Sequence, residues 1–75
     1  MKTTDKGRFV AVKASRSDVA QFASKWPCCG INGSVYAEFD RRNGDLVDVR
    51  VAGQRDYDGS DLAALVDDMK AFAGL

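Results

Sequence analysis

The chain has 75 residues, a formal net charge of zero and 45% hydrophobic residues. This length supports one small domain, near the size at which a single core only just suffices, and the composition is that of a globule rather than a disordered chain. No apolar run approaches the ~20 residues that span a bilayer. The N-terminal stretch lacks the apolar segment of a signal peptide, which predicts a cytoplasmic protein. We expect one domain over residues 1–75 with a flexible polar lead at 1–7.

The charges are unevenly distributed along the chain. Residues 1–27 carry six basic and two acidic side chains, whereas residues 28–75 carry five basic and nine acidic ones. The zero total argues against simple electrostatic capture of nucleic acid. The asymmetry predicts separate basic and acidic patches.

The first regular elements are a strand and a helix. The stretch RFVAVKA, residues 8–14, is rich in β-branched and aromatic residues, which predicts a strand. Ser15 and Asp18 match a capping box, in which two side chains satisfy the free amides at a helix start. Apolar side chains then follow one helical face as far as Trp26, and Pro27 ends the helix.

The stretch KWPCCGING, residues 25–33, contains both cysteines. A zinc site needs four ligands, and a thioredoxin-type pair needs two residues between its cysteines. Cys28 and Cys29 are adjacent and the chain has no His, so we interpret them as structural thiols in a turn. Trp26 is expected to anchor the helix end in the core or, where exposed, to act as a binding anchor.

The clearest pattern is a pair of alternating segments, 34–40 and 46–52, around the turn sequence RRNGD. A three-residue loop at 42–44 keeps the apolar positions of both strands on one face, because a one-residue slip turns every side chain over. We expect Gly44 to lie in a G1 bulge. This register pairs Phe39 with Val47, Ala37 with Val49 and Val35 with Val51.

The last element is an amphipathic helix over residues 61–74, capped by Asp58 or Ser60. Its apolar stripe comprises Leu62, Leu65, Val66, Met69 and Phe72. The element order β-α-β-β-α predicts an α+β two-layer sandwich. We expect a three-stranded antiparallel sheet in the order 1-3-2, with both helices on one face and the other face open.

The sequence offers little catalytic chemistry. It contains no His, the commonest general base, and no Gly-rich phosphate loop or nucleophile elbow. Asp56 with Asp58 and Asp67 with Asp68 form acidic pairs, but such pairs need a concave, partly dry site that a small two-layer domain rarely contains. We therefore expect no enzyme activity, no metal and no cofactor.

The open sheet face is a candidate binding surface. Its expected members are Phe9, Lys13, Tyr36, Glu38 and Arg50. Aromatic and cationic side chains on a sheet are typical of the RNA-recognition motif. Three carboxylates expected on the same face, Glu38, Asp40 and Asp48, would repel phosphates, and the aromatic- and glycine-rich signature of that motif is missing. Nucleic-acid binding is therefore kept as the alternative function.

Three stretches, WPCCGI, FDRRNGDLVDV and DGSDLAAL, resemble small proteins encoded by phages, prophages and conjugative elements of Gram-negative bacteria. The matching positions are Trp26-Pro27-Cys28, Asn43 to Asp48 and Asp58-Gly59-Ser60, within residues 25–66. The resemblance carries no catalytic residue. It implies a stand-alone protein in the bacterial host cell that binds a host protein, as do inhibitors that mask the nucleic-acid-binding surface of CRISPR–Cas or restriction machinery.

Our leading hypothesis is therefore an anti-CRISPR-like inhibitor that acts through acidic side chains, since complementary charge steers association. The candidate contact residues are Asp45, Asp48, Asp56, Asp58, Asp61, Asp67 and Asp68. The alternatives are a nucleic-acid-binding module that uses the open face and a homodimer that pairs across that face or a sheet edge.

Overall fold

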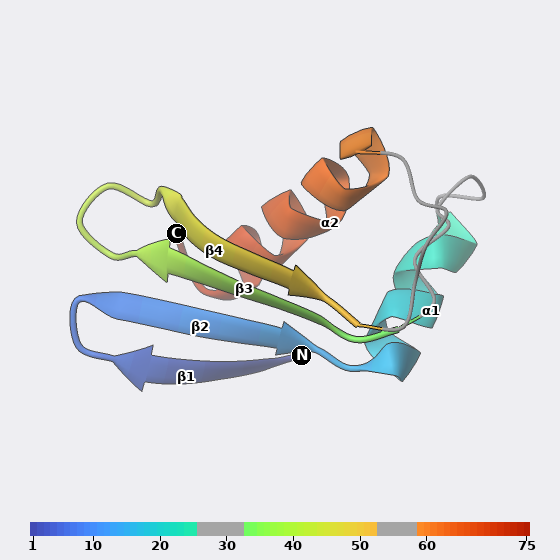
Figure 1. Ribbon diagram of the computed structural model, residues 1–75, viewed down its shortest axis with the longest axis horizontal. Helices are drawn as coiled ribbons and strands as arrows, with labels where there is room; N and C mark the ends of the chain where they lie inside the picture. Colours follow the sequence, from blue (N-terminus) through green and yellow to red (C-terminus); the bar gives the residue numbers. More distant parts are fainter. Residues whose placement is uncertain (26–32, 53–58) are drawn as a thin grey trace.

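A computed structural model describes residues 1–25, 33–52 and 59–75, with residues 22–25, 60 and 61 described by their backbone alone (Figure 1). The expectations for Trp26, Cys28 and Cys29 lie outside the described residues. In chain order the elements are β1 (Lys2–Lys6), β2 (Phe9–Ala14), α1 (Arg16–Lys25), β3 (Val35–Asp40), β4 (Leu46–Val51) and α2 (Gly59–Phe72). Neither described helix is long and apolar enough to cross a membrane.

The sheet has four antiparallel strands in the order β1-β2-β3-β4, so the expected three-stranded sheet in the order 1-3-2 is wrong. Two differences produce this result. The polar stretch expected to be a lead forms β1, which pairs with β2. β2 then pairs with β3, not with β4, because α1 returns the chain so that β3 runs antiparallel beside β2.

The β1–β2 hairpin depends on Gly7. Lys6 pairs with Phe9, so the turn contains only Gly7 and Arg8. Gly7 has a φ of 75°, and no residue other than glycine has a positive φ among those described. A positive φ at the first turn position alone is the type II′ geometry, which suits the twist of two antiparallel strands. The amide of Gly7 also donates a hydrogen bond to Asp5 Oδ1 at 2.8 Å.

The core lies on one face of the sheet. The buried strand residues are Val10, Val12 and Ala14 of β2 and Val35, Ala37 and Phe39 of β3, which pair in register. Val19 of α1 and Leu65 and Met69 of α2 pack against this face and are fully buried. Because side chains alternate between the faces of a strand, the strand residues between these positions lie on the opposite face, which no described helix covers.

The β3–β4 hairpin keeps most of the predicted register but has a different loop. Val51 lies opposite Val35 and Val49 opposite Ala37, as predicted, whereas Phe39 lies opposite Leu46. The Asp40 amide donates to the Asp45 carbonyl at 2.9 Å, which makes the loop four residues long, 41–44. Gly44 has the expected positive φ, 75°, but the extra residue in the ladder is Val47.

The predicted start of α1 is confirmed, whereas the predicted apolar stripe of α2 is buried only in part. The capping box is confirmed: the Ser15 amide donates to Asp18 Oδ2 at 2.9 Å, and the Asp18 amide donates to Ser15 Oγ at 3.2 Å. The apolar stripe of α2 is buried at Leu65 and Met69, but Phe72 is 53% exposed. α2 packs mainly on β2 and β3; Ala73 still packs against the buried cluster, whereas Phe72 lies outside it.

Candidate functional site

The open face of the sheet brings together all five residues predicted for it. Phe9 and Lys13 lie on β2, Tyr36 and Glu38 on β3, and Arg50 on β4. Lys13 pairs with Tyr36, and Tyr36 pairs with Arg50, so these three side chains form one row across the sheet.

β1 adds two cations that the sequence interpretation missed. Lys2 lies opposite Lys13 and Lys6 lies opposite Phe9. The row across all four strands is therefore Lys2, Lys13, Tyr36 and Arg50, with three cations and no carboxylate. The usable sequence signal was Gly7-Arg8, because a Gly-X pair between two stretches that contain β-branched residues is typical of a type II′ hairpin.

Glu38, one of the carboxylates on this face, is bound by its neighbours. Tyr36 Oη donates to Glu38 Oε1 at 2.7 Å, and Lys6 Nζ lies 3.0 Å from the same oxygen. The Tyr36 hydrogen bond and then Lys6 lower the pKa of Glu38 below its ordinary value. The same hydrogen-bond network, Tyr36 first and Glu38 next, raises the pKa of Lys6. Glu38 therefore stays ionised and paired.

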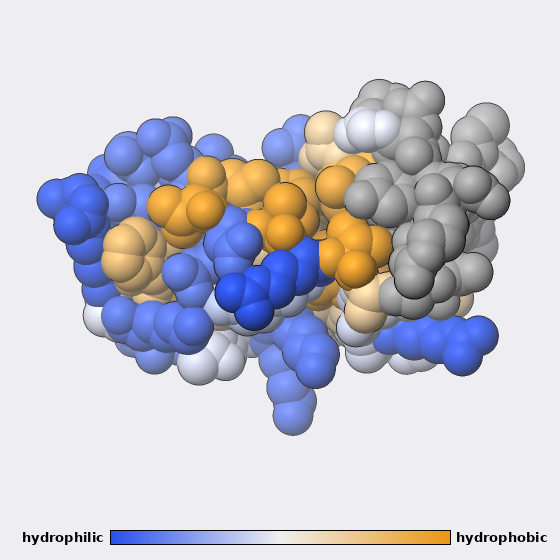
Figure 2. Space-filling model, in the orientation of Figure 1, coloured by the Kyte–Doolittle hydropathy of each residue, from blue (hydrophilic) through white to orange (hydrophobic). Residues whose placement is uncertain are grey.

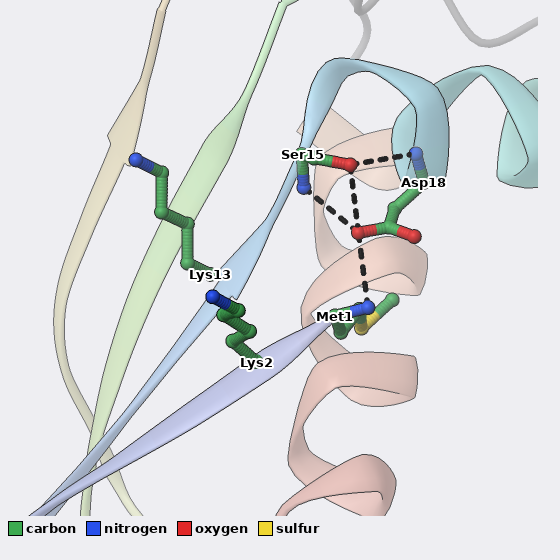
Figure 3. Close-up of a pocket in the computed structure, with 5 residues that line it drawn as sticks. All are labelled: Met1, Lys2, Lys13, Ser15 and Asp18. Carbon is green, nitrogen blue, oxygen red and sulfur yellow. Dashed lines mark hydrogen bonds and ion pairs between the residues drawn. The ribbon is translucent and has the colours of Figure 1, made fainter.

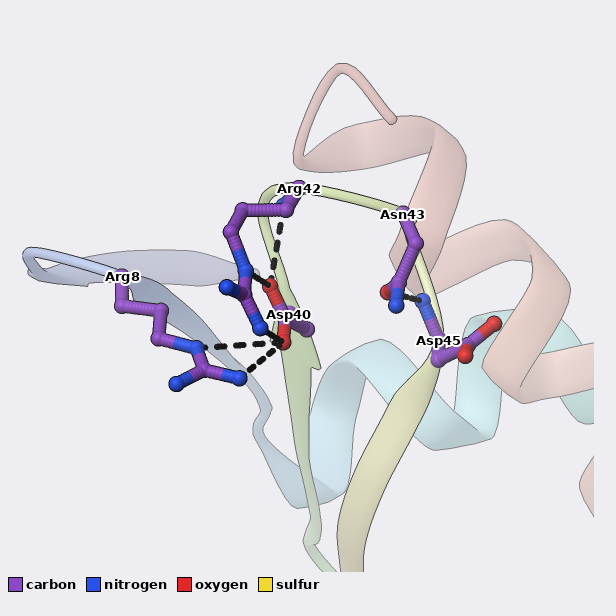
Figure 4. Close-up of polar contacts among 5 residues, drawn as sticks. All are labelled: Arg8, Asp40, Arg42, Asn43 and Asp45. Atoms are coloured by element: carbon purple, nitrogen blue, oxygen red, sulfur yellow. Dashed lines mark hydrogen bonds and ion pairs between the residues drawn. The ribbon is translucent and has the colours of Figure 1, made fainter.

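Asp40 is held by the two hairpin turns that meet at one end of the sheet (Figure 4). The Arg42 amide donates to Asp40 Oδ1 at 2.9 Å. The guanidinium groups of Arg8 and Arg42 lie 3.3 and 3.4 Å from its carboxylate. The Arg42 amide is the main cause that lowers the pKa of Asp40, despite the opposing effect of burial.

The carboxylates lie beneath their cationic partners. The Glu38 and Asp40 side chains are 20% and 7% exposed, whereas Lys6, Arg8 and Arg42 are 47%, 54% and 63% exposed. Asp48 lies beside Arg50, whose Nε is 3.1 Å from Asp48 Oδ2. The outward surface of this face is therefore dominated by cations. The repulsion of phosphates expected from its carboxylates is largely removed by these pairs.

A cationic side chain lies close to each of the two aromatic rings on this face, Tyr36 and Phe9. Lys6 Nζ and Arg50 Cζ lie 5.6 and 5.7 Å from the centroid of the Tyr36 ring, and Arg8 Cζ lies 5.3 Å from that of Phe9. At these distances the ring attracts the cation. The rings therefore hold the cations in place, and a base could stack on them only after a cation had moved.

The structure separates the predicted acidic residues. Asp48 lies on the open sheet face, and Asp45 lies in the β3–β4 loop. Asp67 and Asp68 are exposed on α2, which packs on the opposite face of the sheet. The remaining three cannot be placed: Asp56 and Asp58 lie outside the described residues, and Asp61 is described by its backbone alone. The described members do not form a single acidic surface.

A hollow of about 460 Å³ lies where β1 and β2 meet the start of α1 (Figure 3). Its described lining is Met1, Lys2, Lys13, Ser15 and Asp18. The Met1 ammonium lies 3.0 Å from Asp18 Oδ2. That contact, together with the Ser15 amide and hydroxyl, lowers the pKa of Asp18 to about 2. The polar groups of Met1, Ser15 and Asp18 bind one another and tie Met1 to α1, so these three have a structural role.

Searches for related proteins give no identification: no family model, no curated protein and no solved structure matches the chain. Within residues 1–25, 33–52 and 59–75, no group of three or more His, Cys, Asp or Glu side chains could hold a metal ion. The open sheet face is the candidate site that the described geometry supports best.

Proposed function

We propose that the protein binds single-stranded nucleic acid on the open face of its sheet. The observation that carries this proposal is the layering of charge, in which Glu38 and Asp40 lie below the exposed Lys6, Arg8 and Arg42. A surface that presents cations outward attracts phosphates and releases their counterions. The chain's zero net charge does not oppose this, because binding depends on the local field of the contact surface.

The shape of the face favours a single strand over a duplex. The row from Lys2 to Arg50 crosses four strands and spans roughly 14 Å, at ~4.8 Å per strand spacing. Sheet faces of this kind bind unpaired nucleotides across their strands. Since cations cover the Tyr36 and Phe9 rings, we expect phosphate contacts to dominate over base stacking. Binding should then depend strongly on salt and weakly on sequence.

Fluorescence anisotropy with labelled single strands of about 16 nucleotides tests this proposal. We expect Lys13→Glu to weaken binding and to reduce the slope of log K against log salt concentration by about one. Arg16→Glu is the matched control, because Arg16 is exposed on α1 and away from the sheet face. Absence of binding at low salt, or equal losses in both variants, would contradict the proposal.

A second candidate function, the protein-binding inhibitor, is favoured by a different surface. Phe72 and Leu75 are 53% and 38% exposed. Phe72 follows Asp68 by four residues within α2, a spacing that places both side chains on one side of the helix. Aromatic residues are enriched in protein–protein interfaces, and an acidic residue beside one attracts a basic partner. This surface is separate from the open sheet face.

A pull-down from nuclease-treated bacterial lysate distinguishes the two candidates. The inhibitor function predicts recovery of one host protein at near-stoichiometric yield and its loss in Asp68→Lys or Phe72→Ser. Lys13→Glu is the control and should leave that recovery unchanged. If the wild-type protein recovers no host protein, the inhibitor function is contradicted while nucleic-acid binding is unaffected.

A further inference from the structure

β4 is an edge strand whose outer side has no partner strand among the described residues. It exposes apolar side chains beside its two charged residues: Leu46 and Val47 are 44% and 51% exposed, and Val49 and Val51 are only partly buried. Figure 2 shows an apolar band that follows this strand. An edge of this kind presents free backbone groups and apolar side chains together, which is a template for pairing with another strand.

The backbone of β4 determines which residues can form that pairing. The Ala52 amide donates to the Ser34 carbonyl at 2.9 Å. In an antiparallel ladder, pairs that exchange hydrogen bonds alternate with pairs that do not. Arg50 and Asp48 therefore direct their backbone groups toward β3, whereas Val49 and Val51 direct theirs toward the free edge.

We propose that β4 pairs antiparallel with β4 of a second copy of the chain, centred on Val49. The charges select this register. With Val49 opposite Val49 of the second copy, Asp48 lies opposite Arg50 of the second copy, and the reciprocal pair forms by symmetry. Opposite charges across neighbouring strands are stabilising, whereas like charges are destabilising.

The neighbouring registers are disfavoured. Only residues whose backbone groups point outward can form hydrogen bonds across the edge. Each neighbouring register therefore shifts the second copy by two residues. Pairing Val49 with Val51 of the second copy places Arg50 opposite Arg50, and pairing Val47 with Val49 places Asp48 opposite Asp48. The segment VDVRV, residues 47–51, thus complements itself only when centred on Val49.

The proposed dimer joins two sheets into one. Its two-fold axis runs through the sheet at Val49, so both sets of helices lie on one side and both open faces on the other. The half-exposed Val49 would pack against Val49 of the second copy, and the half-exposed Val51 would lie opposite Val47 of the second copy. Since one short strand supplies the contact, we expect a weak dimer that depends on concentration. The proposal does not rest on nucleic-acid binding.

Sedimentation velocity over about three decades of protein concentration measures the dimer dissociation constant. We expect Arg50→Asp and Asp48→Arg each to raise that constant about tenfold or more, because each places two like-charged pairs across the edge. The double exchange, Asp48→Arg with Arg50→Asp, should restore it to near the wild-type value. Lys13→Asp is the matched control, because it changes the same charge on β2, away from the edge.

Val49→Pro gives an independent test. Proline removes an amide that the β3–β4 ladder does not use, so the fold should persist while pairing is lost; circular dichroism checks the fold. A wild-type protein that stays monomeric throughout the range would overturn the proposal and leave the edge to a strand of another protein. A dimer that is insensitive to Arg50→Asp, or single variants that the double exchange does not rescue, would overturn it equally.

Discussion

The two edges of the sheet are stabilised in different ways. β1 has the sequence KTTDK and all five residues are exposed, whereas β4 has the sequence LVDVRV and packs two valines toward the core. Charged edge strands resist pairing with other chains, and apolar ones permit it. The comparison indicates that one edge is protected by its composition and that the other is available for an interaction.

The contacts of the two edges match this difference. β1 is tied by ion pairs at both ends: the Met1 ammonium lies 3.0 Å from Asp18, Lys6 3.0 Å from Glu38, and Asp5 3.1 Å from Arg41. β4 depends instead on the apolar packing of Val49 and Val51. Ionic contacts respond to salt and pH, and apolar contacts respond to the volume of a side chain.

The largest expected effect tests the core between the two edges. Phe39 is 1% exposed and lies opposite Val10 of β2 and Leu46 of β4. We expect Phe39→Ala to lower the free energy of unfolding by about 3–5 kcal/mol, because it removes buried surface and leaves a cavity. Urea unfolding measures this change. A loss below about 1 kcal/mol would contradict the described core.

The two hairpin glycines come next. Gly7 and Gly44 both have a φ of 75°, so an alanine at either position is expected to cost about 1–2 kcal/mol in strain. A Cβ at Gly44 would lie 3.1 Å from Lys70 Cε, whereas one at Gly7 has no neighbour among the described residues within 4 Å. Lys70 Cε belongs to the end of a flexible side chain that can shift, so Gly44→Ala should be only slightly the more costly, as measured by thermal unfolding.

Removing the Lys70 side chain tests whether its contact causes the difference between Gly44→Ala and Gly7→Ala. In a Lys70→Ala background the extra cost of Gly44→Ala should disappear, leaving both hairpins equally sensitive. An unchanged difference would show that the contact with Lys70 does not cause it.

Substitutions at the two edge strands should have smaller and unequal effects on the free energy of unfolding. Val49→Ala is expected to cost about 1 kcal/mol, since it removes part of a half-buried side chain. Thr4→Ala, at the exposed opposite edge, should change the free energy of unfolding by less than about 0.5 kcal/mol. Both variants are measured at low protein concentration, so that dimer formation does not contribute. Equal costs would remove the distinction between the edges.

The fold could be predicted from the sequence where side chains alternate with burial. The segment that forms β3 has this pattern, and its pairing with Val49 and Val51 is confirmed. β1 could not be found in this way, because all of its residues are exposed and none is apolar. Because this strand was missed, the strand order was predicted for a three-stranded sheet, and the resulting order was wrong.

The sequence was sufficient to predict which residues share the open sheet face. It was not sufficient to predict which of their charges are exposed. The alternation of side chains along the strands is enough to predict that Lys13, Tyr36 and Arg50 share one face. The relative depth of the charges was not predictable, because it depends on the turns that bring Arg8 and Arg42 over Asp40. The bulge at Val47 was also missed, since a four-residue loop and a three-residue loop fit the same turn sequence.

Acid should weaken the ion pair that ties Met1, the residue before β1, to Asp18 of α1. The pKa of Asp18 is lowered to about 2 from its ordinary value near 3.8, chiefly by the hydrogen bond from the Met1 ammonium. Because the pKa is lower in the folded state, the stability it contributes is complete above about pH 4 and is lost as the pH falls toward 2. N-terminal acetylation removes the ammonium and should raise the pKa of Asp18, as measured by carboxyl NMR titration.

High salt should also destabilise β1 more than β4. At about 1 M salt the Debye length falls to about 3 Å, which screens the exposed ion pairs of β1, whereas apolar packing at β4 is not weakened. Hydrogen exchange at neutral pH should therefore become faster for β1 amides that face β2, while β4 amides that face β3 keep their protection. Equal acceleration at both edges would mean that β1 and β4 open together as one cooperative unit, and that the ion pairs contribute nothing specific to β1.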